Sequence, residues 1–142
     1  MGKYEIPIRI RVLDPVDGVT MQVQRGKCEL LSPVKRSRKE LVFEFPMTAD
    51  ISGDMPNFLG AYAQGPRDSR FVYVNSGSYA GQTGTSWNRR AKLTLMDITR
   101  RQIEEIVNSA NKRLEVSFEG TGRDGGPTCA SVKGVEWKVV EE

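Results

Sequence analysis

The sequence of 142 residues contains no histidine and only two cysteines, Cys28 and Cys129. The absence of histidine excludes Ser-His-Asp and Cys-His nucleophilic sites, ordinary catalytic zinc sites and histidine-based pH switches. Two thiols without histidine do not complete a structural zinc site, and we expect no metal or other cofactor. A disulfide needs an oxidising compartment, and free cysteine behaves as a small hydrophobic residue. We therefore expect two free thiols.

Long apolar runs are also missing from the chain. None approaches the roughly 18 residues that a membrane span requires, and the first residues lack the apolar stretch of a signal peptide. We therefore expect a cytoplasmic protein with no membrane partner. The net charge is only +3, from 21 basic and 18 acidic residues. The sequence does not indicate an oligomeric state.

Length and composition favour a single mainly β domain over residues 1–142. Hydrophobic residues make up 38% and charged residues 27% of the chain, which is typical of a globular protein with one core. Apolar residues alternate with polar ones, as in half-buried strands. Seven strands are predicted, around residues 4–12, 19–23, 41–47, 71–74, 91–95, 114–118 and 135–139. The first two are interpreted as a hairpin, and Pro7 favours an edge position or a bulge.

One segment changes to a helical period. Its apolar stripe consists of Ile103, Ile106, Val107 and Ala110. Thr99 with Gln102 matches a capping box, which predicts a helix that begins at Thr99 and ends near Asn111. Together these elements predict a single antiparallel β-sandwich or partly closed barrel of about seven strands, with this helix packed on one side. A two-layer α+β arrangement is the alternative.

Three stretches have no clear period: residues 32–39, 50–68 and 75–88. Irregular segments longer than about 12 residues in a compact domain are usually functional or mobile. Residues 75–88 are small and polar but include Tyr79 and Trp87. Such rings either pack back on the edge of the core or offer a flat surface to a sugar, a base or a peptide side chain. Gln82 lies between them and can supply hydrogen bonds.

A glycine-rich segment at residues 120–127 literally matches the dinucleotide motif GxGxxG. The motif requires a helix directly after it, whereas Gly126 and Pro127 follow here, and we reject that interpretation. One remaining interpretation is a hairpin loop with positive φ at several glycines. The other is a loop that holds Arg123 and Asp124 towards a ligand, or towards each other as an internal clamp.

The charged clusters elsewhere in the sequence each have a structural interpretation as well as a functional one. Residues 35–39 hold four cations, and with Arg89, Arg90 and Lys92 they can form a phosphate-binding stripe. Acidic residues follow at once, so we expect a solvated hairpin loop and no nucleic-acid partner. Two acid pairs are compatible with calcium or with ordinary turn chemistry. These pairs are Asp14 with Asp17 and Asp50 with Asp54.

Several stretches together resemble a small bacterial family of single-domain proteins of unknown function. The resemblance covers residues 6–137, and the run Gly-Thr-Gly-Arg-Asp-Gly-Gly-Pro at residues 120–127 is its most specific part. The other matching stretches are residues 63–66, 70–74, 80–82, 89–93 and 129–130, with Trp137. The resemblance implies a free-standing bacterial protein of one domain, and it carries no activity to transfer.

Three function classes follow from these patterns. The first is a binding module for a small polar molecule or sugar, with Tyr79, Gln82, Trp87, Arg123 and Asp124 as ligand contacts. The second is a histidine-free enzyme with Asp124 or Glu119 as acid–base and Arg123 as anion holder. The third is a weak nucleic-acid-binding surface at residues 35–39. The sequence predicts the first and leaves enzymatic activity open.

Overall fold

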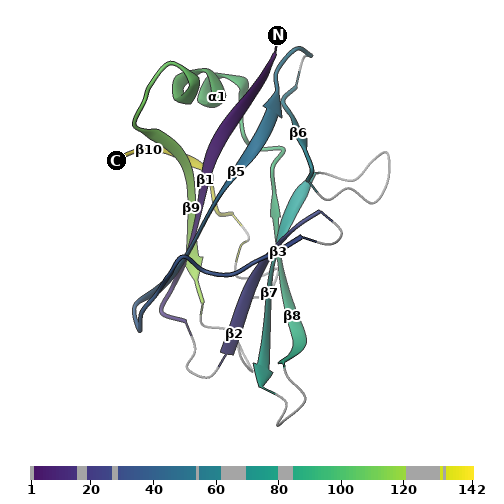
Figure 1. Cartoon of the computed structure of the whole chain (residues 1–142), viewed down its shortest axis with the longest axis vertical. Coiled ribbons are helices and arrows are strands. Elements are labelled where there is room, and N and C mark those ends of the chain that lie inside the picture. The colour runs from purple at the N-terminus through teal and green to yellow at the C-terminus, as the bar shows by residue number, and fades with distance from the viewer. Residues whose placement is uncertain are drawn as a thin grey trace.

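The computed structural model describes residues 2–15, 19–26, 29–53, 55–61, 70–79, 85–120, 132 and 134–142. The described chain forms ten strands and one helix (Figure 1). The strands are β1 (Lys3–Leu13), β2 (Val19–Arg25), β3 (Glu29–Leu31), β4 (Lys35–Arg36), β5 (Glu40–Asp50), β6 (Asn57–Leu59), β7 (Phe71–Tyr79), β8 (Thr85–Thr94), β9 (Lys112–Glu119) and β10 (Lys138–Glu141). The helix is α1 (Arg100–Val107).

The strands form two sheets, which confirms the mainly β sandwich. Sheet A has the order β10-β9-β1-β5-β4, with β6 also pairing with β5. Sheet B has the order β3-β2-β7-β8. One pair departs from the antiparallel pattern: β1 and β9 are parallel, from Ile8 beside Leu114 to Leu13 beside Glu119. The chain returns from sheet B through α1, so β9 starts beside the helix and runs in the direction of β1 (Figure 1).

The predicted hairpin between the first two strands is wrong. β1 pairs with β5 and β9 in sheet A, whereas β2 pairs with β3 and β7 in sheet B. The connection turns a corner at Asp14, which has a φ of 49° and donates its N–H to the carbonyl of Lys39 at 2.8 Å. Alternation shows that one face of a strand is buried, and here both strands bury that face in one core from different sheets.

The core lies on the inner face of sheet A, which carries alternate residues of β1, Ile6, Ile8, Ile10 and Val12. Helix α1 contacts β1, β9 and β10, and it buries Ile103 and Ile106 in this core. Sheet B contributes side chains to the same core, among them Met21, Val23, Val72 and Val74. Figure 1 shows α1 and sheet B towards opposite ends of sheet A. The helix therefore covers one part of the inner face, and sheet B covers the other.

Helix α1 begins as predicted and ends four residues earlier. Thr99 is the N-cap, and its side chain and that of Gln102 form both hydrogen bonds of a capping box. Val107 is 39% exposed, and Ala110 is also exposed, so the buried stripe is shorter than the sequence predicts. Asn108 caps the C-terminal end, and β9 starts only a few residues later.

Pro7 lies in β1, which is an interior strand of sheet A rather than an edge strand. Its partner in β5 is also a proline, Pro46. Pairing of β1 with β9 begins only at Ile8, and pairing of β5 with β6 begins only at Thr48. Both prolines therefore lie where the other side of their strand is unpaired among the described residues. A missing N–H breaks no ladder bond at such a position.

Most of residues 75–88, predicted to be irregular, form the two arms of the β7–β8 hairpin. The pairing reaches Tyr79 beside Thr85, with a register shift between Ser76 and Gly77. Ladder hydrogen bonds are made by the backbone, so small polar residues can form a hairpin without apolar alternation. Residues 35–39 are also part of a hairpin, since β4 pairs with β5, in agreement with the prediction for this segment.

Among the described residues, no helix combines the length and the apolar character that a bilayer span requires.

Candidate functional site

The five residues predicted as ligand contacts fall in two parts of the chain. Tyr79 is the last residue of β7, and Trp87 lies in β8 beside Gly77, so both belong to one end of the β7–β8 hairpin. Gln82, Arg123 and Asp124 lie outside the described residues. The convergence of the hairpin end with the glycine-rich segment therefore stays a prediction.

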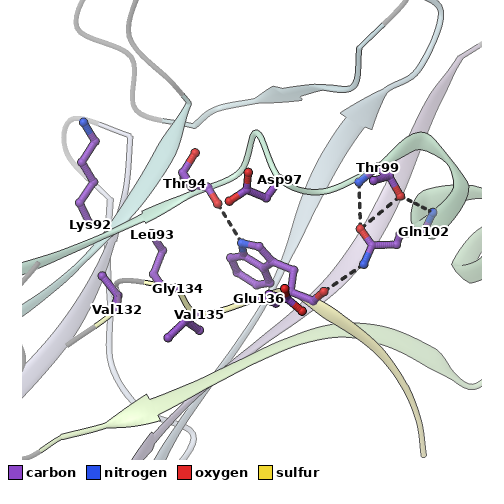
Figure 2. Close-up of a pocket in the computed structure, with 11 residues that line it drawn as sticks. Lys92, Leu93, Thr94, Asp97, Thr99, Gln102, Val132, Gly134, Val135 and Glu136 are labelled. Carbon is purple, nitrogen blue, oxygen red and sulfur yellow. Dashed lines mark hydrogen bonds between the residues drawn. The ribbon is translucent and has the colours of Figure 1, made fainter. Parts of the chain in front are cut away.

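A large hollow lies at the opposite end of β8. It has a volume of about 1040 Å³ and is bounded by β8, the turn that leads into α1 and the segment before β10 (Figure 2). Its lining consists of Lys92, Leu93, Thr94, Asp97, Thr99, Gln102, Val132, Gly134, Val135, Glu136 and Trp137. This volume is at the upper end of the range for small-molecule sites, about 300–1,000 Å³.

Trp137 ties the segment before β10 to the end of β8. Its indole Nε1–H donates to the carbonyl oxygen of Thr94 at 2.8 Å, and the residue is only 6% exposed (Figure 2). A buried tryptophan normally needs such a partner for its N–H. The indole also packs in the core shared by both sheets. This wall of the hollow is therefore held by a hydrogen bond and by core packing.

Gln102 ties the same segment to the helix. Its Oε1 accepts from the backbone N–H of Thr99 at 2.8 Å, and its Nε2 donates to the carbonyl of Trp137 at 3.0 Å (Figure 2). The amide is thus held at both ends by backbone groups. The walls from β8, α1 and the segment before β10 are connected by hydrogen bonds, as preorganised binding of a small molecule requires.

The polar groups of the hollow come mainly from Thr94, Asp97 and Glu136. Asp97 and Glu136 are exposed, and among the described residues neither carboxylate forms an ion pair. Figure 2 shows Lys92 at one end of the drawn lining and Gln102 at the other, with Thr94 and Asp97 between them. Leu93, Val132 and Val135 supply apolar wall. Such a mixture can hold a small polar molecule through a few hydrogen bonds and an apolar contact.

Sequence reasoning missed Asp97 and Glu136. Asp97 lies in the turn between a predicted strand and a predicted helix, and the capping box at Thr99 locates that turn within two residues. The capping box could therefore have drawn attention to Asp97 as a turn residue. No pattern in the sequence indicates that residues 134–137 lie across the hollow from Asp97. Glu119, the acid named as an alternative catalytic group, is exposed at the end of β9 and does not line this hollow.

The outer face of sheet A carries ion pairs across three strands. Arg9 of β1 bonds to Glu115 of β9 at 3.1 Å, and Arg11 bonds to Glu40 of β5 at 2.6 Å and 2.8 Å. The guanidinium of Arg11 lowers the pKa of Glu40, and this carboxylate raises the pKa of Arg11. Lys35 reaches the same carboxylate at 3.3 Å. The charges on this face are therefore largely used in pairing with each other.

The acid pairs considered for calcium are only partly described. Asp17 and Asp54 lie outside the described residues, as do Cys28 and Cys129. Asp50 accepts hydrogen bonds from the N–H and the hydroxyl of Ser52, at 3.0 Å and 2.6 Å, which is ordinary turn chemistry. Where the structure describes the chain, no three acidic or cysteine side chains gather as metal ligands.

One protein family matches the chain over nearly its whole length. Its description is "Family of unknown function (DUF5990)", and the match covers residues 6–140. The chain belongs to this family. The match agrees with the expected membership of a family of unknown function, and the description assigns no activity to its members. No curated protein and no solved structure matches the chain.

Proposed function

We propose that the chain is a binding module for a small polar molecule, which occupies the hollow beside Trp137. The observation that carries this proposal is the hollow of about 1040 Å³ whose three walls are tied together by Trp137 and Gln102. Asp97, Glu136 and Thr94 supply hydrogen-bond acceptors at its surface. Exposed carboxylates that form no described ion pair are suited to hydroxyl or amine groups of a ligand.

Arg123 and Asp124, predicted from the sequence as ligand contacts, lie outside the described residues. The segment with Arg123 and Asp124 joins Gly120 to Val132, and Val132 lines the hollow. We therefore keep Arg123 and Asp124 as candidate ligand contacts beside Asp97 and Glu136.

The hairpin end with Tyr79 and Trp87 is a separate location, and Gln82, which follows Tyr79 in the chain, lies outside the described residues. Trp87 and Leu93 are six residues apart along β8, which corresponds to about 20 Å in a strand. A single small ligand does not span both places. A site at the hairpin end, with a sugar or other polar ligand, is the second location that a binding experiment must distinguish.

A thermal shift screen tests the proposal. The library holds sugars, amino acids and other polar metabolite-sized compounds, and the proteins are the wild type and the double variant Asp97→Asn with Glu136→Gln. Both residues are exposed, so the variant is expected to fold. We expect at least one compound class to raise the Tm of the wild type, because a ligand that binds only the folded state stabilises it.

The double variant should lose most of that rise in Tm. Glu141→Gln is the matched control, since Glu141 is exposed in β10 and does not line the hollow, and it should respond like the wild type. The proposal is contradicted if no compound raises the wild-type Tm, or if the double variant responds as strongly as the wild type.

A further inference from the structure

The β8 strand forms one edge of sheet B, and among the described residues only β7 pairs with it. Just past this pairing, the backbone N–H of Leu95 donates to the carbonyl of Arg70 at 2.8 Å. In an antiparallel pair, the backbone groups of successive residues point alternately towards the partner strand and away from it. Those of Lys92 and Thr94 therefore point away from β7, towards the open edge.

The hydrogen bond at Thr94 agrees with this direction. Its carbonyl oxygen accepts from the indole Nε1–H of Trp137 at 2.8 Å, and Trp137 belongs to the segment before β10. A side chain makes this bond, and within the described chain no backbone ladder joins β8 to that segment. The N–H of Thr94 and both backbone groups of Lys92 therefore lack a described partner at the edge that lines the hollow.

The side chain of Lys92 is used elsewhere. Its ammonium nitrogen lies 4.1 Å from the ring centre of Phe71, a buried residue of β7. Lys92 is nevertheless exposed and lines the hollow at the end opposite Gln102 (Figure 2). Because the ammonium is held on the ring, Lys92 offers the hollow its main chain, which has one donor and one acceptor.

We infer that the hollow binds a short extended peptide that pairs its main chain with the β8 edge at Lys92 and Thr94 and carries a basic side chain. This inference rests on the function proposed above and names the class of its ligand. Strand addition takes its affinity from main-chain hydrogen bonds and its specificity from contacts to alternate side chains. Asp97 and Glu136 form no described ion pair, and their carboxylates complement a lysine or arginine of the peptide.

The walls of the hollow limit the length and the other side chains of the peptide. Trp137 occupies the carbonyl of Thr94, so the added ladder ends at the N–H of that residue. Alternate residues of a strand are about 7 Å apart, so a peptide of roughly three to five residues covers the two paired positions. Leu93, Val132 and Val135 supply apolar wall for its remaining side chains.

A titration with two pools of pentapeptides tests the inference. Both pools have blocked ends and vary valine, isoleucine, threonine and serine around a central residue, which is lysine in one pool and glutamate in the other. We expect the lysine pool to shift the backbone amide signal of Lys92 saturably and to slow its hydrogen exchange by about tenfold or more, because a ladder bond protects the N–H. The glutamate pool should bind about tenfold more weakly, since Asp97 and Glu136 repel it.

Two variants separate the main chain of Lys92 from its side chain. Lys92→Pro removes the outward N–H and leaves the ladder with β7 intact. It should weaken binding of the lysine pool by about tenfold, the effect of one lost hydrogen bond. Lys92→Ala keeps the N–H and should weaken binding by less than about twofold, as expected for a side chain that does not contact the ligand.

N-methylated peptides provide the same test without a change in the protein. In an added strand, only every second residue turns its N–H towards the edge. Methylation of a paired amide in the best-binding peptide of the lysine pool should abolish binding, and methylation of the next amide should not.

The inference is overturned if neither pool shifts the Lys92 amide, if both pools bind equally well, or if Lys92→Ala weakens binding as much as Lys92→Pro. Equal binding of all N-methylated peptides also overturns it, whether or not Lys92→Pro folds. The thermal shift screen separates this failure from failure of the proposed function. If small compounds bind the hollow and peptides do not, the inference fails and the function stands. If neither binds, both fail.

Discussion

Gly120 allows the end of β9 to lie against the start of the corner that leaves β1. Its N–H donates to the carbonyl of Leu13 at 2.6 Å. A Cβ at this position would lie 2.6 Å from Cγ1 of Val12, 3.0 Å from Cα of Pro15 and 3.1 Å from the carbonyl oxygen of Leu13. Two of these three atoms belong to the backbone, and valine has little freedom to move its methyl group. Space, rather than positive φ, therefore requires glycine here.

Gly120→Ala should lower the free energy of unfolding by about 1–3 kcal/mol, the usual effect of overpacking. Gly53→Ala is the control, because a Cβ on Gly53 would meet nothing within 4 Å, and it should change stability by less than about 0.5 kcal/mol. Urea denaturation of both variants measures the difference. Equal stability of Gly120→Ala and the wild type would show that β9 does not approach β1 as described.

The free energy of unfolding depends on pH through the carboxyl group of Glu40. Its pKa is lowered from the ordinary value of 4.5, chiefly by the hydrogen bonds from Arg11. A carboxyl group with a lowered pKa in the folded state stabilises the fold above the ordinary value, and this contribution is lost as the pH falls through the lowered pKa. The stabilisation that Glu40 contributes is therefore lost at pH values below 4.5.

Glu40→Gln should reduce stability by roughly 1 kcal/mol or less at pH 7, since the pair is partly solvent-exposed. Between pH 7 and pH 3 the variant should lose less stability than the wild type, because the titrating group is gone. Urea denaturation at several pH values is the measurement, with Glu5→Gln as a control at an exposed residue of the same sheet. Parallel pH curves for Glu40→Gln and the wild type would refute the role of this pair.

At the scale of elements, helix α1 depends on a short buried stripe. Ile103 and Ile106 are 0% and 4% exposed, whereas Val107 is 39% exposed. Ile98, the residue before the N-cap, is also buried and has the spacing of a hydrophobic staple with Ile103. The helix therefore packs on sheet A through a few buried residues near its start and middle. It does not use an apolar face that runs along its whole length.

Ile106→Ala should destabilise the protein by about 2–4 kcal/mol, because it leaves a cavity under the helix. Val107→Ala is a neighbouring change at an exposed position and should cost less than about 0.5 kcal/mol. Thermal or urea unfolding of the two variants provides the comparison. A loss below about 0.5 kcal/mol for Ile106→Ala would mean that the helix does not pack on the sheet as described.

Elements with apolar alternation could be predicted from the sequence, and their partners could not. The alternation of β1, β5 and β9 and the capping box at Thr99 each report a local property, namely one buried face or one helix start. Whether β1 pairs with β2 or with β5 depends on contacts between distant residues. The alternation of apolar and polar residues carries no information about those contacts. The arms of the β7–β8 hairpin near Tyr79 were missed because their small polar residues carry no alternation.

At the scale of the molecule, the hollow exists because two distant segments meet. Residues from the range 92–102 line one side, Val132 and residues 134–137 line the other, and Trp137 joins the two sides through its hydrogen bond to Thr94. The sequence indicated a polar-ligand module but placed its contacts on loops. The pairing of β10 with β9 and the hydrogen bond from Trp137 to Thr94 hold the segment before β10 beside the end of β8. Asp97 and Glu136 therefore could not be recognised as neighbours of one site.

The most direct test of a ligand site beside Trp137 is an NMR titration of the two indole N–H signals with a compound from the polar library that raises the Tm. The chain has only two tryptophans, and Trp87→Phe assigns the signals. The account predicts that the Trp137 signal shifts saturably, that the Trp87 signal stays in place, and that Asp97→Asn weakens the titration. A bound compound that moves Trp87 and leaves Trp137 unchanged would place the ligand at the hairpin end and contradict the account.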